Sequence, residues 1–183
     1  MTIEHSIVTD PDIHEPKGIS TAVANKVYVA ISAGAGAWMY PTAHGSVSYV
    51  DLTTGTTYVT PTVYTKLAPT TVASGSAIEV TEATTAKTTY TGTPTRHVRI
   101  SANVTVGQTA GASRPLTFAV YKNGSILANS EIRTEITGST LQNVFLHYDG
   151  TVVTNDYFEV YAKITGTGNI VVYTMVTHFM AVV

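Results

Sequence analysis

The chain has 183 residues, of which only 12% are charged, and its formal net charge at pH 7 is −2. Because it has no cluster of Lys and Arg, it is a poor candidate for nucleic-acid binding by phosphate neutralisation. It has no run of the roughly 20 apolar residues that a membrane-spanning helix needs, and without cysteine it can form neither disulfides nor thiolate metal sites.

Threonine and tyrosine are unusually frequent. The sequence contains 33 threonines and 11 tyrosines, and these residues, like valine, suit the pleated and half-buried surface of a β-sheet. The composition therefore predicts an all-β protein. The chain is long enough for one domain with a hydrophobic core and some length to spare.

Residues 1–44 are predicted to form an extended N-terminal arm. Asp-Pro and Glu-Pro steps interrupt regular structure, and the small residues of the Ser-Ala-Gly-Ala-Gly-Ala run at 32–37 are poor core formers. A short strand is expected at 27–31, and the first ten residues lack the pattern of a signal peptide. A segment of this kind favours docking, since it can become ordered on contact with another protein.

Residues 45–74 are predicted to form a β-hairpin and a linker. Two strand-like runs flank Thr-Thr-Gly, so the hairpin is expected at 46–60.

Residues 75–183 carry the clearest strand pattern. The run 97–106 alternates, and we expect one face to hold Val98, Ile100, Ala102, Val104 and Val106. A strand around 116–120 leads into Asn123-Gly124, a pair that tolerates the positive φ angles of a tight hairpin turn. Three more strands are expected within 141–150, 156–166 and 169–183, and this spacing of turns favours a β-sandwich or jelly roll.

The final segment, 169–183, is apolar on both faces if it alternates strictly. A strand of a monomeric sandwich buries only one face, so the second face predicts a contact between subunits, or a cover made by segment 46–60. The expected interface residues are Tyr157, Tyr161, Val171, Tyr173, Met175 and Phe179.

No motif indicates catalysis, a metal or a cofactor. His14 and Glu15 are adjacent, so on an extended chain they point to opposite sides and cannot chelate one ion. The Gly-Ala-Gly run lacks the third glycine of a dinucleotide fingerprint, because Met39 stands there. No His-x-His pair occurs, and the isolated histidines of the strand region are His97, His147 and His178. We therefore expect no enzyme activity, no metal and no cofactor.

Tyr58, Tyr64 and Tyr90 leave two interpretations open. They pack at sheet faces or subunit contacts, or they stack on sugars in a receptor-binding protein.

Three segments resemble the jelly-roll domains of the tumour-necrosis-factor and complement C1q type. In that pattern a segment like Tyr90-Thr91-Gly92 precedes a long strand. A hairpin like Lys122-Asn123-Gly124 follows, and a segment like Asn155-Asp156-Tyr157 leads into the last strands. The resemblance covers residues 75–183, and it implies a TNF/C1q-like jelly-roll sandwich that forms a homotrimer.

The N-terminal segment resembles that of a group of tailed-bacteriophage virion proteins. There a D-P-x-x-H-E-P-K-G motif precedes a G-x-G-x-W run, and the matching residues are Asp10, Pro11, His14, Glu15, Pro16, Lys17, Gly18, Gly34, Gly36 and Trp38. The resemblance implies a capsid decoration, cement or head-fibre protein that is made in the host cytoplasm. Its arm would attach it to the major capsid protein or another virion protein, on the capsid surface. The alternative is a tail-associated fibre that binds a host receptor or surface glycan. Neither role involves nucleic acid or membrane insertion.

Overall fold

The computed structural model describes residues 24–32, 35–59, 62–108, 112–137, 140–166 and 168–182. The chain divides into two compact units, Met1–Pro41 and Thr42–Val183. In the first unit, β1 (Val27–Ser32) and β2 (Ala35–Met39) pair as an antiparallel hairpin. The strand expected at 27–31 is therefore confirmed, and β2 adds a second one that includes part of the Gly-Ala run.

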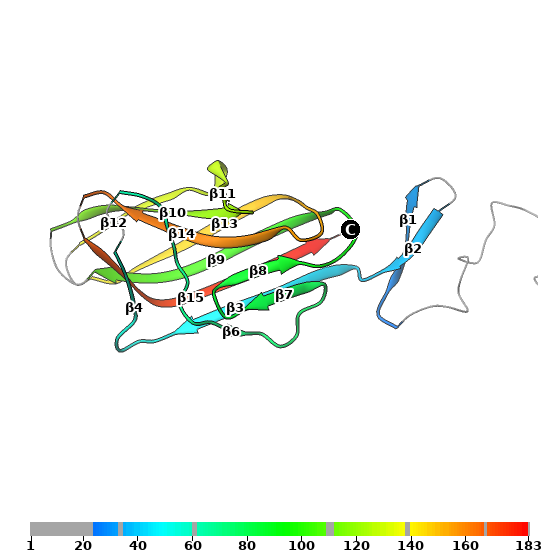
Figure 1. The fold of residues 1–183 in the computed structure, drawn as a ribbon, viewed down its shortest axis with the longest axis horizontal. Coiled ribbons are helices and arrows are strands. Elements are labelled where there is room, and N and C mark those ends of the chain that lie inside the picture. Colours follow the sequence, from blue (N-terminus) through cyan, green and yellow to red (C-terminus); the bar gives the residue numbers. More distant parts are fainter. Residues whose placement is uncertain are drawn as a thin grey trace, which may run out of the picture. The chain divides into compact units, whose positions relative to one another are not determined.

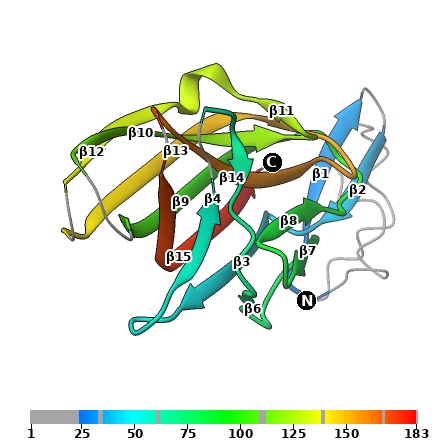
Figure 2. The ribbon, with the colours of Figure 1, turned by 60° about the vertical axis from the view of Figure 1, so that its left-hand side comes forward.

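The second unit is a sandwich of two antiparallel sheets (Figure 1, Figure 2). The first, called here the β15 sheet, has the order β13-β9-β15-β3-β6, and β4 also pairs with β15. Its strands are β3 (Thr42–Val50), β4 (Thr56–Val59), β6 (Val72–Ala73), β9 (Arg96–Gln108), β13 (Gln142–Val152) and β15 (Asn169–Val182).

The second sheet, called here the β14 sheet, has the order β11-β10-β14-β8-β7, with β12 paired to β10 and β5 paired to β14. Its strands are β5 (Thr65–Lys66), β7 (Val80–Ala83), β8 (Lys87–Tyr90), β10 (Arg114–Lys122), β11 (Ser125–Ile126), β12 (Ile132–Ile136) and β14 (Tyr157–Ile164). A single turn of 3-10 helix, Ala128–Ser130, links β11 to β12.

The order of the strands is that of a jelly roll. From β8 onward the chain crosses between the sheets, so that β9, β13 and β15 lie in one sheet while β10, β12 and β14 lie in the other. This places β13-β9-β15-β3 against β12-β10-β14-β8, the two four-stranded sheets of a double Greek key. The predicted all-β jelly-roll sandwich is confirmed.

Strict alternation holds along β9 and builds one side of the core. The side chains of Val98, Ile100, Ala102, Val104 and Val106 are all buried, and they belong to one hydrophobic cluster with residues of both sheets. The Asn123-Gly124 turn is also confirmed, since both residues have positive φ and the turn joins β10 to β11.

The hairpin expected at 46–60 is wrong. β3 and β4 do not pair with each other, because both run antiparallel to β15, with Val50 opposite Thr174 and Thr56 opposite Val172. The chain leaves the sheet edge only briefly between them. The carboxylate of Asp51 accepts hydrogen bonds from the backbone N–H groups of Thr53 and Thr54, at 3.1 and 3.0 Å, and this turn returns the chain to the same edge.

The sandwich also begins earlier than the predicted boundary at residue 75. β3 is a full strand of the β15 sheet, and its Ala43 and Val47 are buried. Residues 42–44, which the prediction assigned to the arm, are therefore part of the sheet. Alternation in β3 is hard to see in the sequence because its inward positions include Ala43 and Gly45 rather than larger apolar residues.

A bulge in β15 changes which residues face the core. The register shifts between Val172 and Thr174, and beyond it Met175 and Phe179 lie inside the sandwich with 0% and 1% of their surface exposed. These two residues belong to the core of a single chain, so assigning them to a subunit interface was wrong. The exposed or half-buried residues on the other side of β15 are Val176, His178, Met180 and Val182.

Candidate functional site

Most of the predicted docking residues lie outside the described residues. These are Asp10, Pro11, His14, Glu15, Pro16, Lys17, Gly18 and Gly34. The remaining two, Gly36 and Trp38, lie on β2.

Gly36 and Trp38 both contact Tyr28 of the neighbouring strand. The rings of Tyr28 and Trp38 meet edge to face, with 5.4 Å between their centroids. A Cβ atom on Gly36 would lie 2.6 Å from Cε1 of Tyr28, so the tyrosine ring occupies the space where a side chain would stand. The small residue at this position is explained by a contact within the chain, without a second protein.

The remaining predicted interface residues do not form one surface. Val171 is buried, and its Cγ1 lies next to Gly55 of the loop between β3 and β4. Tyr173 is half-buried and lies near Gly55 and Gly107. The turn at Gly55 thus lies beside Val171 and Tyr173, but the competing prediction of a hairpin at 46–60 folded over this face is wrong, because β3 and β4 pair with β15 in the same sheet. Tyr157 and Tyr161 lie on β14, in the opposite sheet.

The outer face of the β15 sheet is a broad surface with few charges. The strand registers align its side chains in four rows that cross β3, β15, β9 and β13. The rows are Thr42, Val182, His97 and Thr151; His44, Met180, Arg99 and Asp149; Ser46, His178, Ser101 and His147; and Ser48, Val176, Asn103 and Phe145. Phe145 and Met180 expose 60% and 43% of their surface. Apart from histidines, only Arg99 and Asp149 of these sixteen residues are ionisable.

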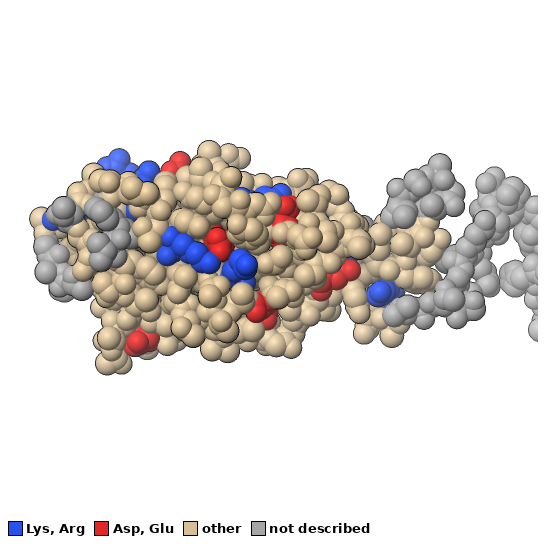
Figure 3. All heavy atoms as spheres, viewed as in Figure 1, with Lys and Arg blue, Asp and Glu red and all other residues tan. Residues whose placement is uncertain are grey.

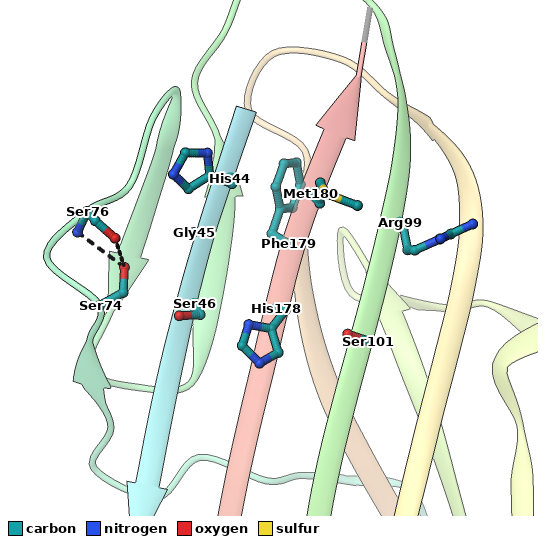
Figure 4. Close-up of a pocket in the computed structure, with 10 residues that line it drawn as sticks. All are labelled: His44, Gly45, Ser46, Ser74, Ser76, Arg99, Ser101, His178, Phe179 and Met180. Carbon is teal, nitrogen blue, oxygen red and sulfur yellow. Dashed lines mark hydrogen bonds between the residues drawn. The ribbon is translucent and has the colours of Figure 1, made fainter. Parts of the chain in front are cut away.

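A shallow pocket of about 340 Å³ lies on this face, mainly over β3 and β15 (Figure 4). His44 and His178 line it from neighbouring strands, and serines from three segments complete its polar part. A second pocket of about 200 Å³ lies beside Arg99 and Asp149. Sequence reasoning missed His44 as a member of this surface, since nothing local marks it.

Arg99 and Asp149 form an ion pair on this face. Nε of Arg99 donates to the Asp149 carboxylate at 3.1 Å, and Nε2 of His147 lies 2.7 Å from its other oxygen. These two contacts, with His147 as the larger cause, hold the pKa of Asp149 below its ordinary value. The carboxylate is therefore ionised and already balanced by a cation.

Lysines are found on the opposite sheet. The lysines of the described sandwich are Lys66, Lys87, Lys122 and Lys163, and all four lie on strands of the β14 sheet. Figure 3 shows Lys and Arg side chains beside Asp and Glu side chains on the face it presents. Lys66 pairs with Glu159 at 2.5 Å. The outer face of the β15 sheet thus carries fewer charged side chains than the strands of the β14 sheet.

Three tyrosines pack together against the β14 sheet. Tyr121 stacks on Tyr161 with 3.8 Å between ring centroids, and Tyr64 meets Tyr121 edge to face at 5.7 Å. Nζ of Lys163 lies 4.2 Å from the centre of the Tyr64 ring. Burial and a hydrogen bond that Tyr64 donates to Glu131 raise the pKa of Tyr64. These rings contact one another and a lysine, as the packing interpretation predicted.

The other two candidate sugar-stacking tyrosines are also packed. Tyr90 is fully buried and stacks on Phe179 at 6.0 Å, so it cannot serve as an exposed platform. Tyr58 packs against the core, and burial raises its pKa to about 12.

The motif residues shared with the C1q-type pattern have structural roles. Asp156 is buried, and its carboxylate accepts bonds from Nζ of Lys122 at 2.7 Å, Nδ2 of Asn123 at 2.6 Å and the backbone N–H of Val153 at 2.8 Å. Burial raises the pKa of Asp156, but these contacts outweigh it and the net shift is downward. The carboxylate thus ties the Asn123-Gly124 turn to the start of β14.

Tyr90 and Gly92 anchor the beginning of β9. The tyrosine ring lies over Gly92 and leaves no room for a side chain there. Its hydroxyl donates to the carbonyl of Pro94 at 2.8 Å and accepts a bond from Nε of Arg96 at 2.9 Å. Arg96 is buried and pairs with Glu79 at 2.6 Å.

Within the described ranges, no group of three or more His, Cys, Asp or Glu side chains is placed to hold a metal ion. The carboxylates of Asp149 and Asp156 are both engaged by the side chains named above. No helix among the described residues has the length and hydrophobicity to cross a membrane.

Comparison with known proteins finds similarity at the level of the fold. No family model matches the sequence, and no curated protein matches it. Among solved structures, the PRD1 vertex protein P5 is 14% identical with a TM-score of 0.47, over 77% of this chain and 96% of that one.

Two further solved structures have a similar fold. The Eiger TNF from S. frugiperda is 7% identical with a TM-score of 0.45, over 78% of this chain and 93% of that one. The globular domain of the zebrafish complement 1qA protein is 11% identical with a TM-score of 0.41, over 78% and 97%.

Proposed function

We propose that the chain is a structural protein of a bacteriophage particle, a homotrimer that decorates the head as a cement or head-fibre protein. Its N-terminal segment docks on the major capsid protein or another virion protein, and its jelly roll forms the trimer. The protein has no enzymatic role and needs no cofactor.

The observation that carries this proposal is the division of the chain at Pro41. Every described residue of the hydrophobic core cluster lies at or after Ala43, so the described residues before Pro41 take no part in that cluster. The described part of the first unit is a two-stranded hairpin with Val27 and Tyr28 exposed, and an isolated hairpin is marginally stable in water. A segment whose described residues lie outside the core cluster, and that carries the phage-type motif, is suited to docking.

The trimer contact belongs on the outer face of the β15 sheet. This face presents Phe145, Val176, Met180 and Val182 among small polar residues, and its one charged pair, Arg99 and Asp149, is neutral overall. A surface without net charge meets copies of itself without like-charge repulsion. The lysine-bearing β14 sheet is then left to face solvent.

The alternative is a tail-associated fibre that binds a host surface glycan. Tyr64 and Tyr161 favour it, because both residues are only partly buried and their hydroxyls contact the carboxylates of Glu131 and Glu159. Loss of binding to host cells on Tyr64→Ala, with the protein found on the tail of the particle and not on the head, would favour this role.

Add-back to particles that lack the protein tests the proposal. The full chain should bind to such particles, whereas residues 42–183 should fold, form trimers and fail to bind. The matched full-length control Lys87→Ala alters a half-buried residue of the β14 sheet and should bind normally. Equal occupancy by the full and shortened chains would refute docking through the N-terminal segment.

A further inference from the structure

All histidines of the described residues lie on one surface. These four residues, His44, His97, His147 and His178, come from β3, β9, β13 and β15, and the strand registers place each of them on the outer face of the β15 sheet. His44 is half-buried and the other three are exposed. Figure 4 shows His44 and His178 at the same pocket.

Few other ionisable groups face these histidines. Arg99 and Asp149 lie in the row between His97 and His147, and Asp149 contacts both Arg99 and His147. Glu82, on β7, approaches β3 near His44. Its carboxylate is engaged by the hydroxyl of Ser74 at 2.6 Å and by the backbone N–H of Ser46. Of the four histidines, His147 alone contacts a carboxylate among the described residues, that of Asp149, and this carboxylate already balances the charge of Arg99. A proton added to any of the four therefore gives the face a net positive charge.

We propose that the outer face of the β15 sheet is a contact between copies of the chain that opens when its histidines bind protons. The partner is a second copy, and the inference rests on the trimer contact proposed above. At neutral pH the face has no net charge, since Arg99 balances Asp149. Each proton taken up adds a positive charge, to a maximum of four per copy. These charges would face those of the neighbouring copies and would lose water on contact.

The direction of the pH dependence follows from proton linkage. Free histidine side chains bind protons below about pH 6.5. A histidine that must be neutral in the contact weakens association by about tenfold per pH unit below that value, and has no effect above it. Several histidines per copy make the transition steep. Each copy should keep its fold at pH 5, because Asp156 and Glu82, which hold the sandwich loops, remain ionised there.

Sedimentation velocity of the full chain between about pH 7.5 and pH 5 tests the proposal, with circular dichroism to follow the fold. We expect trimers at the higher pH, folded monomers at the lower, and full reversibility. The fourfold variant with His44→Gln, His97→Gln, His147→Gln and His178→Gln should be trimeric at both. As a matched control, His5→Gln with His14→Gln removes the two histidines outside the described residues and should dissociate like the unmodified chain.

The other outcomes separate the two proposals. Monomers at both pH values would overturn the trimer contact itself. Trimers at both would leave that contact in place and overturn its control by histidine. If the fourfold variant does not assemble, the single variants His44→Gln and His178→Gln test the control by histidine instead. Each should move the dissociation midpoint of the chain to lower pH, and unmoved midpoints would overturn the proposal.

Discussion

Replacing Asp156 with alanine should destabilise the sandwich strongly. Three donors converge on its buried carboxylate, and one of them is the ammonium group of Lys122. Hydrogen bonds to charged groups contribute about 1.5–3 kcal/mol each, and breaking a buried ion pair costs about 3–5 kcal/mol. Lys122 keeps 23% of its side chain exposed, so it stays partly solvated without its partner. We therefore expect a loss near the lower limit, about 3 kcal/mol, or a fall in melting temperature of roughly 10 °C.

Urea unfolding followed by circular dichroism measures this loss. The pKa of Asp156 is lower in the folded protein than in the unfolded chain, where it is about 3.9. Its contribution is therefore fully present above that value and disappears as the pH falls through the folded pKa. The difference between Asp156→Ala and the unmodified protein should persist from pH 7 to pH 5 and shrink below pH 4.

The matched control is Glu135→Gln, which removes the charge of an exposed carboxylate on β12 of the β14 sheet, outside the proposed contact between copies. The interactions of an exposed carboxylate contribute little to stability because water solvates the charge, so the unfolding midpoint should not change measurably. Equal effects of the two substitutions, or a loss below about 1 kcal/mol for Asp156→Ala, would refute the reasoning.

Three further changes test other parts of the structure. Met180→Asp should abolish self-association and leave the fold intact, because Met180 is 43% exposed. Phe179→Asp should prevent folding, because Phe179 is 1% exposed. Size-exclusion chromatography and circular dichroism distinguish the two variants, and identical behaviour would contradict the bulge in β15. Gly55→Ala should lower the free energy of unfolding by about 1–3 kcal/mol more than Gly75→Ala does. Both glycines have positive φ, but only at Gly55 would a Cβ atom meet Val171, at 2.6 Å. Equal urea midpoints of the two variants would refute this. Excess EDTA should leave the melting temperature and the trimer unchanged, and a fall of several degrees would reveal a metal site.

The elements that sequence predicted well depend on local chemistry. The alternation of Val98 to Val106 is confirmed because β9 lies inside the sheet, paired in a regular register with β13 on one side, while the extra residue of the bulge on its other side belongs to β15. The Asn123-Gly124 turn follows from two residues that accept positive φ. In both cases a few neighbouring residues decide the conformation.

The features that sequence missed depend on pairing between distant strands. Val171, Val172 and Tyr173 are all large and apolar or aromatic, so nothing in the sequence marks the bulge that places Met175 and Phe179 inside. β3 and β4 look like a hairpin because a glycine-containing turn separates them, yet β15 is long enough to pair with both.

The four histidines on the outer face of the β15 sheet are the clearest example of residues that only strand pairing brings together. They are separated by 31 to 53 positions in the sequence order, and only the registers of β3, β9, β13 and β15 bring them together. Taken one at a time, each is an isolated histidine on a strand. The proposed docking segment is the opposite case, because its motif is visible in the sequence while most of its residues lie outside those that the structure describes.

A reconstruction of the phage particle by electron microscopy tests the central claim most directly. We expect threefold density that matches the sandwich at repeated sites on the head, with the first 41 residues in contact with a capsid protein. Density confined to the tail would favour the fibre alternative. Absence of the protein from purified particles would contradict a role in the virion.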